Sequence, residues 1–134
     1  MTTESCPCQS GKPLNQCCGP ILEGKAQAQT AEALMRSRYT AYATNQIDYL
    51  ERSHAPGEAH TFNRSAAEAW SEEADWLGLK IIATQGGDTK DREGVVEFIA
   101  RYIWDSKEEE HHERALFLKI DGQWYFVGGK LVET

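Results

Sequence analysis

The spacing of apolar residues changes near the middle of the chain. Between residues 30 and 76 they recur every three or four positions, whereas between 77 and 127 they alternate with polar residues. The first spacing is typical of helices with one buried face, and the second of half-buried strands. Because the helices come first and the strands follow, the sequence predicts an α+β fold with an antiparallel sheet.

Three helices are predicted in the first half. The longest follows Thr30, whose side chain can cap a helix N-terminus, and it ends near Asn45. A short second helix is expected at residues 47–50. Ser65 is the predicted cap of a third helix, which carries Trp70 on its apolar side and runs to about position 76.

Four strands are predicted in the second half, and they form a meander. Their expected ranges are 77–84, 94–104, 111–120 and 123–127. The Asp121-Gly122 pair between the last two strands is a strong signal for a two-residue hairpin turn. Residues 105–110, which are rich in glutamate, are expected to form a charged loop.

All four cysteines lie in the first 24 residues, a segment that predicts loops and tight turns. Cys6 and Cys8 form one close pair, and eight residues separate it from the pair Cys17 and Cys18. Two close pairs joined by a short loop are typical of sites in which four thiolates hold one Zn²⁺. We therefore expect a zinc knuckle at residues 1–24, with one structural zinc per chain, followed by an α+β domain at residues 25–134.

The same four cysteines have other interpretations. Disulfides are one, although a bridge between the adjacent Cys17 and Cys18 would strain the peptide. The sequence starts without the basic and apolar regions of a signal peptide, which favours the cytoplasm, where thiols stay reduced. An iron–sulfur cluster has little support from this spacing. A redox pair formed by Cys17 and Cys18 is a further alternative.

Composition and charge narrow the classes of partner. Hydrophobic residues make up 40% of the chain, which is enough for a folded core. No apolar run approaches the roughly 20 residues of a membrane-spanning helix. The formal net charge of −7 and the lack of a dense basic cluster argue against binding to a phosphate backbone. We expect no membrane and no nucleic acid among the partners.

The cysteine segment resembles a known zinc motif. Residues 6–12 read CPCQSGK and residues 17–19 read CCG. This pattern resembles the SEC-C motif, the zinc-binding tail of the SecA translocation ATPase. The resemblance implies that the metal ligands are Cys6, Cys8, Cys17 and Cys18.

A longer resemblance covers nearly the whole chain. The segments EALMRSRYTAY at 32–42, IDYL at 47–50 and HHER at 111–114 resemble the YchJ family of uncharacterised bacterial proteins. The resemblance implies a nuclear-transport-factor-2-like domain, in which a curved antiparallel sheet wraps on helices into a cone that often encloses a pocket. It also implies a homodimer formed through the sheet. Longer family members carry a second, C-terminal SEC-C motif, and we expect a single knuckle here.

The candidates for the lining of such a pocket lie on the predicted helices and on the third strand: Arg36, Tyr39, Tyr42, Trp70, His112 and Glu113. The aromatic side chains are equally typical of a packed core. Arg36 could clamp an anionic ligand; alternatively, its stem packs on aromatic rings with the head in water, or it pairs with Asp48.

The histidines of the third strand pose a question of orientation. Neighbouring residues of a strand point to opposite faces, so His111 and Glu113 share one face while His112 and Arg114 share the other. Both faces carry apolar residues, which leaves open which of them lines the cone. A histidine beside a carboxylate can act as a general acid or base, and the alternative is a histidine pair at the rim with no chemical role.

Three functions are consistent with the sequence. The first is a binding or adaptor protein, whose zinc knuckle contacts a protein partner and whose cone domain takes a small ligand. The second is an enzyme that acts on a small molecule in the cone, with His112 or Glu113 as acid–base. The third is a thiol redox protein that uses Cys17 and Cys18.

Overall fold

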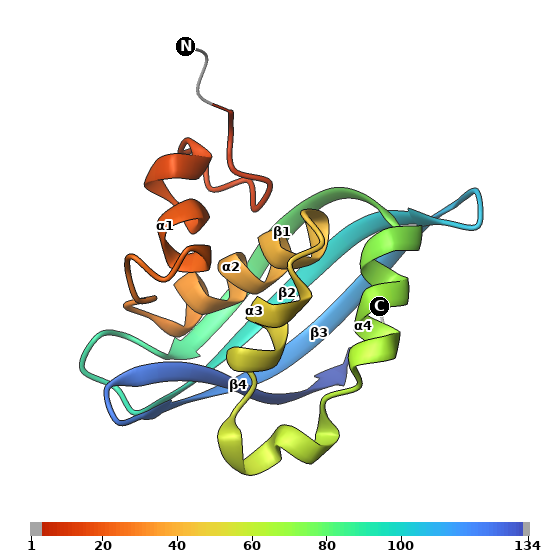
Figure 1. Ribbon diagram of the computed structural model, residues 1–134. Coiled ribbons are helices and arrows are strands. Elements are labelled where there is room, and N and C mark those ends of the chain that lie inside the picture. Colours follow the sequence, from red (N-terminus) through yellow and green to blue (C-terminus); the bar gives the residue numbers. More distant parts are fainter. Residues whose placement is uncertain (1–3, 133–134) are drawn as a thin grey trace.

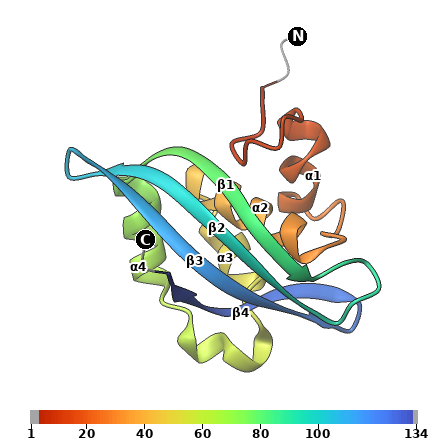
Figure 2. The same ribbon diagram turned by 180° about the vertical axis from the view of Figure 1, so that it is seen from behind.

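The computed structural model describes residues 4–132, in which helices cover one face of a curved, four-stranded sheet (Figure 1). The strands lie in the order β1-β2-β3-β4, and each is antiparallel to its neighbours. Figure 2 shows the opposite face of the sheet, over which none of the described helices lies. Within residues 4–132, no helix is both long and apolar enough to cross a membrane.

The predicted order of three helices and then four antiparallel strands is confirmed. The N-terminal segment adds short helical turns, so the prediction that it holds only loops and turns was wrong. The elements are η1 (Leu14–Gln16), α1 (Cys18–Leu22), α2 (Ala31–Ala43), α3 (Ile47–Arg52), η2 (Pro56–Thr61), α4 (Arg64–Glu73), β1 (Asp75–Gly86), β2 (Glu93–Trp104), β3 (Lys107–Ile120) and β4 (Gln123–Leu131).

The caps of the two longer helices differ in how well the sequence predicts them. The Thr30 side chain accepts a hydrogen bond from the backbone N–H of Ala33 at 3.0 Å, which confirms its role at the start of α2. At α4 the prediction of Ser65 was wrong, because Asn63 has the extended backbone of a cap and its Oδ1 accepts from the N–H of Ala66 at 3.0 Å. Both residue types cap helices well, and residue type alone cannot choose between them.

The two-residue turns of the β2–β3 and β3–β4 hairpins share one backbone geometry. At Asp121-Gly122 both φ angles are positive, 49° and 81°, as the predicted tight turn requires. Asp105 and Ser106 adopt the same left-handed region, with φ of 52° and 67°. β3 therefore begins at Lys107, and the predicted charged loop at 105–110 was wrong for its last four residues. These side chains are exposed, which is why a charged sequence can still form strand there.

The buried face of the sheet is the one that packs on α2. Val96, Phe98 and Ala100 of β2 point to this side, as do Ala115 and Phe117 of β3, and all five are at most 4% exposed. Across the β3–β4 hairpin, Leu118 pairs with Tyr125. Because side chains alternate along β3, His111 and Glu113 lie on the same face as Phe117.

Candidate functional sites: a cysteine cluster and an aromatic cavity

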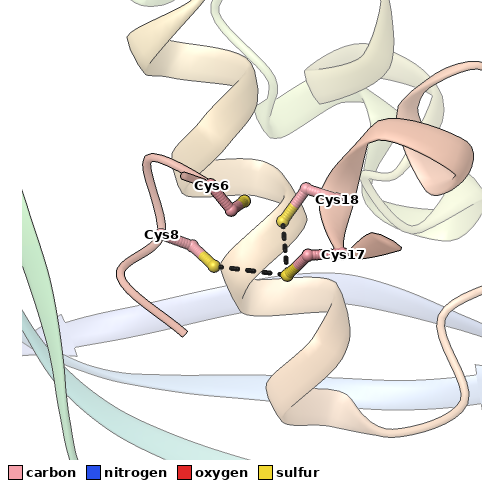
Figure 3. A group of neighbouring side chains, drawn as sticks. All are labelled: Cys6, Cys8, Cys17 and Cys18. Carbon is pink, nitrogen blue, oxygen red and sulfur yellow. Dashed lines mark hydrogen bonds between the residues drawn. The ribbon is translucent and has the colours of Figure 1, made fainter. Parts of the chain in front are cut away.

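The four cysteines form one cluster beside α2 (Figure 3). All four Sγ atoms lie within 4.8 Å of one another, with 3.6 Å between Cys8 and Cys17 and 3.8 Å between Cys17 and Cys18. A tetrahedron whose centre lies about 2.3 Å from each sulfur, as in zinc sites, has edges of about 3.8 Å. The thiols are free. The cluster therefore has the donor set and the spacing that a tetrathiolate metal site needs.

Two turns bring the cysteine pairs together. The first folds back after Cys8, where Gln9 and Gly11 take positive φ angles of 61° and 89°, and the N–H of Gln9 bonds to the carbonyl of Cys6 at 3.0 Å. In the second pair, Cys18 is the first residue of α1. A Cβ at Gly19 would lie 2.7 Å from the carbonyl oxygen of Leu14, so this position needs glycine.

The cluster holds its negative charge unevenly. The pKa of Cys8 is lowered to about 4, mainly by a hydrogen bond from the neighbouring Cys18 thiol. The same hydrogen bond raises the pKa of Cys18. Burial raises the pKa of Cys17. One thiolate is thus stabilised by thiols around it, and each further deprotonation is opposed by the charge already present. A cation at the centre would stabilise four thiolates together.

Polar side chains around the cluster come from the knuckle and from α2. The hydroxyl of Ser10 lies 3.2 Å from the Sγ of Cys17, and the hydroxyl of Thr40 lies 3.6 Å from the Sγ of Cys6. Arg36 donates from Nη1 to the carbonyl oxygen of Cys8 at 2.8 Å, and its Nε is held by Glu32 at 3.0 Å. Arg36 therefore supports the cysteine loop, and its predicted place in the pocket was wrong.

The side chain of Gln9 fixes the knuckle to the edge of the sheet. Its Oε1 accepts from the N–H of Leu79 at 3.2 Å, and its Nε2 donates to the carbonyl of Leu77 at 3.5 Å. The Gln9 amide thus pairs with backbone groups at the edge of β1 as a neighbouring strand would. At the same place, the pairing of β1 with β2 shifts register between Trp76 and Gly78. Cys6, Cys8, Cys18 and Leu22 belong to the same buried cluster as the core of the sheet, so the knuckle and the α+β domain share one core.

A second candidate site is a cavity of about 90 Å³ between the helices and the buried face of the sheet. Of the predicted pocket residues, Tyr39, Tyr42, Trp70 and Glu113 line it. Trp70 packs against Tyr42 and Trp76, with ring centroids 5.0 and 5.1 Å away. The full lining is Met35, Arg38, Tyr39, Tyr42, Trp70, Trp76, Phe98, Ala100, His111, Glu113 and Phe126.

The histidine in this cavity is His111, and the prediction of His112 was wrong. His111 Nε2 lies 2.8 Å from Glu113 Oε1, and the ring stands edge-on to Trp70 with centroids 5.0 Å apart. His112 points to the opposite face, where its Nε2 meets Glu97 Oε2 at 2.8 Å. Because side chains alternate along β3, the two histidines point to opposite faces. Both faces carry apolar residues, so the sequence could not tell which histidine lines the cavity.

Arg38 is the cavity residue that the sequence analysis missed. It lies two positions after Arg36 on α2, and this rotation carries it from the knuckle side to the sheet side of the helix. Its guanidinium carbon lies 4.4 Å from the centre of the Phe126 ring. The signal available in the sequence was the spacing from Leu34 and Met35, which places Arg38 on the buried face.

Comparison with known proteins places the chain in a family. A model described as "YchJ, middle NTF2-like domain" matches residues 30–129. The chain belongs to the YchJ family. The UPF0225 protein GSU1048 of Geobacter sulfurreducens is 46% identical over 127 residues, covering 95% of this chain and 79% of the relative. The UPF0225 protein PC1_1977 of Pectobacterium carotovorum is 43% identical over 136 residues, covering 98% of this chain and 86% of the relative.

Solved structures of similar chains agree with the fold. A SEC-C motif containing protein from Rhodopseudomonas palustris matches with a TM-score of 0.87 and 42% identity, covering 96% of this chain and 98% of that one. A second SEC-C motif containing protein, from Psychrobacter arcticus, matches with a TM-score of 0.80 and 30% identity, covering 96% and 83%. The resemblances to the YchJ family, to its NTF2-like fold and to SEC-C motif proteins are therefore confirmed.

Proposed function

We propose that this protein is a zinc-stabilised binding protein whose NTF2-like domain takes a small molecule into the aromatic cavity. The observation that supports this proposal is the composition of the cavity wall. It is lined mostly by aromatic and apolar side chains, with a few polar groups, Arg38, His111 and Glu113, that converge on it. This composition is typical of small-molecule sites, in which apolar walls supply contact area and a few polar groups fix orientation.

The cysteine cluster is proposed to hold one Zn²⁺ through four thiolates, in the cytoplasm. Four soft donors at tetrahedral spacing support this assignment over a redox pair, in which two thiols suffice. Zinc would supply folding free energy to the knuckle, which rests on α2 and on the edge of β1. The same two elements carry Tyr39 and Trp76 of the cavity wall, so metal loss should loosen the binding site.

The contacts of the knuckle favour this structural role over one in protein recognition. Gln9 and Arg36, two of its polar contacts, are engaged within the chain. A partner that binds through a correctly folded knuckle should be captured by the native chain and lost with Cys17→Ser. Capture of the same partner by both proteins would place its binding surface elsewhere.

A fragment screen by two-dimensional NMR on the zinc-loaded full chain tests the proposal. We expect small molecules to shift the resonances of cavity residues and to change the fluorescence of Trp70 and Trp76. Ala100→Leu, which adds three carbon atoms to the cavity wall, should abolish these shifts while the spectrum stays that of a folded protein. Ala83→Leu, the same change at an exposed position of β1, is the control. Absence of any binder, or equal binding by the Ala100 variant, would refute the assignment of the cavity.

Proton-transfer catalysis is a second candidate, because His111 and Glu113 form a hydrogen-bonded pair inside the cavity. Such a pair can act as an acid–base if a reacting group comes within reach. Each molecule that binds in the screen should be followed by proton NMR over hours. Turnover that is lost in both His111→Gln and Glu113→Gln would replace the binding role by catalysis, whereas unchanged ligands support binding alone.

A further inference from the structure

Arg38 is a buried charge without an ion-pair partner. Its side chain is 5% exposed, and Nη1 donates to the carbonyl oxygen of Leu50 at 2.9 Å and to the hydroxyl of Ser53 at 2.6 Å. Across residues 4–132, none of the ion pairs involves this arginine. Its hydrogen bonds go to neutral oxygens, and its guanidinium stacks on the face of Phe126.

Such an arrangement is costly unless the charge meets an anion. A buried charge loses its hydration, and burial lowers the pKa of Arg38, yet an arginine side chain stays protonated in proteins. Stacking on Phe126, with 4.4 Å between guanidinium carbon and ring centre, offsets part of this loss. No carboxylate of residues 4–132 lies within ion-pair distance of Arg38, and Glu113, which lines the same cavity, acts on its charge only from farther away.

Arg38 borders two cavities, and part of its guanidinium makes no hydrogen bond within the described chain. Arg38 lines the 90 Å³ cavity described above and an adjoining one of about 240 Å³ beside η2 and α4, and both also contact Tyr42, Trp70 and Phe126. Nη1 makes the two bonds to Leu50 and Ser53, while Nε and Nη2 make none within the described chain. Nε and Nη2 form one edge of the planar group, whose spacing matches the two oxygens of a carboxylate.

We propose that the cavity binds a small monocarboxylate, with Arg38 as its counter-ion. This inference rests on the proposed function and adds the chemical class of the ligand. The aromatic walls would take the apolar body of the molecule. Glu113 lines the same cavity and would repel a second carboxylate, which favours one negative charge over two. An apolar cavity of about 150 Å³ can hold benzene, so a cavity of about 90 Å³ limits the ligand to a short molecule unless it extends into the adjoining cavity.

Three compounds with three carbon atoms each separate the effect of one carboxylate from the effects of the carbon chain and of a second carboxylate. On the zinc-loaded full chain, ¹⁵N NMR titrations with propionate, propan-1-ol and malonate follow the cavity resonances and the Nε–Hε signal of Arg38. We expect propionate to bind at least tenfold more tightly than propan-1-ol and than malonate, and to shift the Arg38 signal. Equal binding of propionate and propan-1-ol would overturn the role of Arg38 while leaving a small-molecule site in place. Binding by none of these compounds or of the screened fragments would overturn both proposals.

Two variants test whether the preference for propionate comes from the charges of Arg38 and Glu113. Arg38→Leu should abolish the preference for propionate over propan-1-ol, and Arg101→Leu, which removes an exposed arginine, should preserve it. If Arg38→Leu does not fold, Glu113→Gln gives an independent test, because removing the repelling charge should narrow the gap between propionate and malonate at least threefold. An unchanged gap in a folded Glu113→Gln protein contradicts the proposed ligand class.

Discussion

The contact between Gln9 and Gly78 gives the sharpest prediction about how the knuckle is held. A Cβ at Gly78 would lie 2.7 Å from the side-chain Cδ of Gln9, closer than real Cβ contacts allow. Gly78→Ala should therefore expel the Gln9 amide from the edge of β1. The amide then loses its bonds to the N–H of Leu79, at 3.2 Å, and to the carbonyl of Leu77, at 3.5 Å.

The size of the effect follows from these two bonds. A hydrogen bond contributes about 1 kcal/mol net, so losing the two bonds costs about 1–2 kcal/mol. The alanine itself restores roughly 0.5 kcal/mol, so Gly78→Ala should lower the free energy of unfolding by about 0.5–1.5 kcal/mol. Without the Gln9 side chain the same substitution meets no obstacle. Alanine then stabilises the strand by roughly 0.5 kcal/mol relative to glycine, because it restricts the unfolded chain.

A double-mutant cycle measures this coupling. Wild type, Gln9→Ala, Gly78→Ala and the double variant are unfolded in urea at one fixed concentration of free zinc. We expect the single changes to be non-additive, with a coupling free energy of about 1–2 kcal/mol. Additive effects, within about 0.3 kcal/mol, would refute the view that Gly78 is small in order to admit the amide of Gln9.

Further predictions concern a helix cap, a buried histidine and the cysteine loop. Asn63→Ala should cost about 1 kcal/mol in thermal unfolding, whereas Ser65→Ala should be nearly neutral; the reverse order would contradict the observed cap. Burial and the charge of Arg38 lower the pKa of His54 below 6.5, so protonation favours the unfolded chain and stability should fall as pH drops below 6.5. The loss between pH 7 and 5 should shrink in His54→Gln, and an equal loss would exclude His54 as its source. Arg36→Leu should speed zinc release to a chromogenic chelator several-fold through loss of its bond to the Cys8 carbonyl, an effect that Arg101→Leu should not produce.

The order of elements could be predicted because local patterns determine it. Alternating apolar residues specify strands, and Asp121-Gly122 specifies a turn with two positive φ angles, whatever the rest of the chain does. The charged end of β3 could not be predicted in this way. Residues 107–110 look like a loop by composition, and they form strand because Asp105 and Ser106 make the turn and the ladder with β2 continues to Lys107.

The cysteine cluster could be predicted because its four residues are close in the sequence, whereas the cavity is built from residues far apart. Alternation placed His111 with Glu113 and His112 with Arg114, but both faces of the strand carry apolar side chains. Only the packing of α2 decides which face is inside. The same packing distinguishes Arg36 from Arg38, since two arginines two positions apart on a helix face different neighbours.

Native mass spectrometry of freshly purified protein tests the central claim about the metal most directly. We expect a mass equal to the chain plus one zinc, and four cysteines that react with iodoacetamide only after a chelator removes the metal. A metal-free chain with four reactive thiols, or one with Cys17 and Cys18 joined in a disulfide, would contradict it.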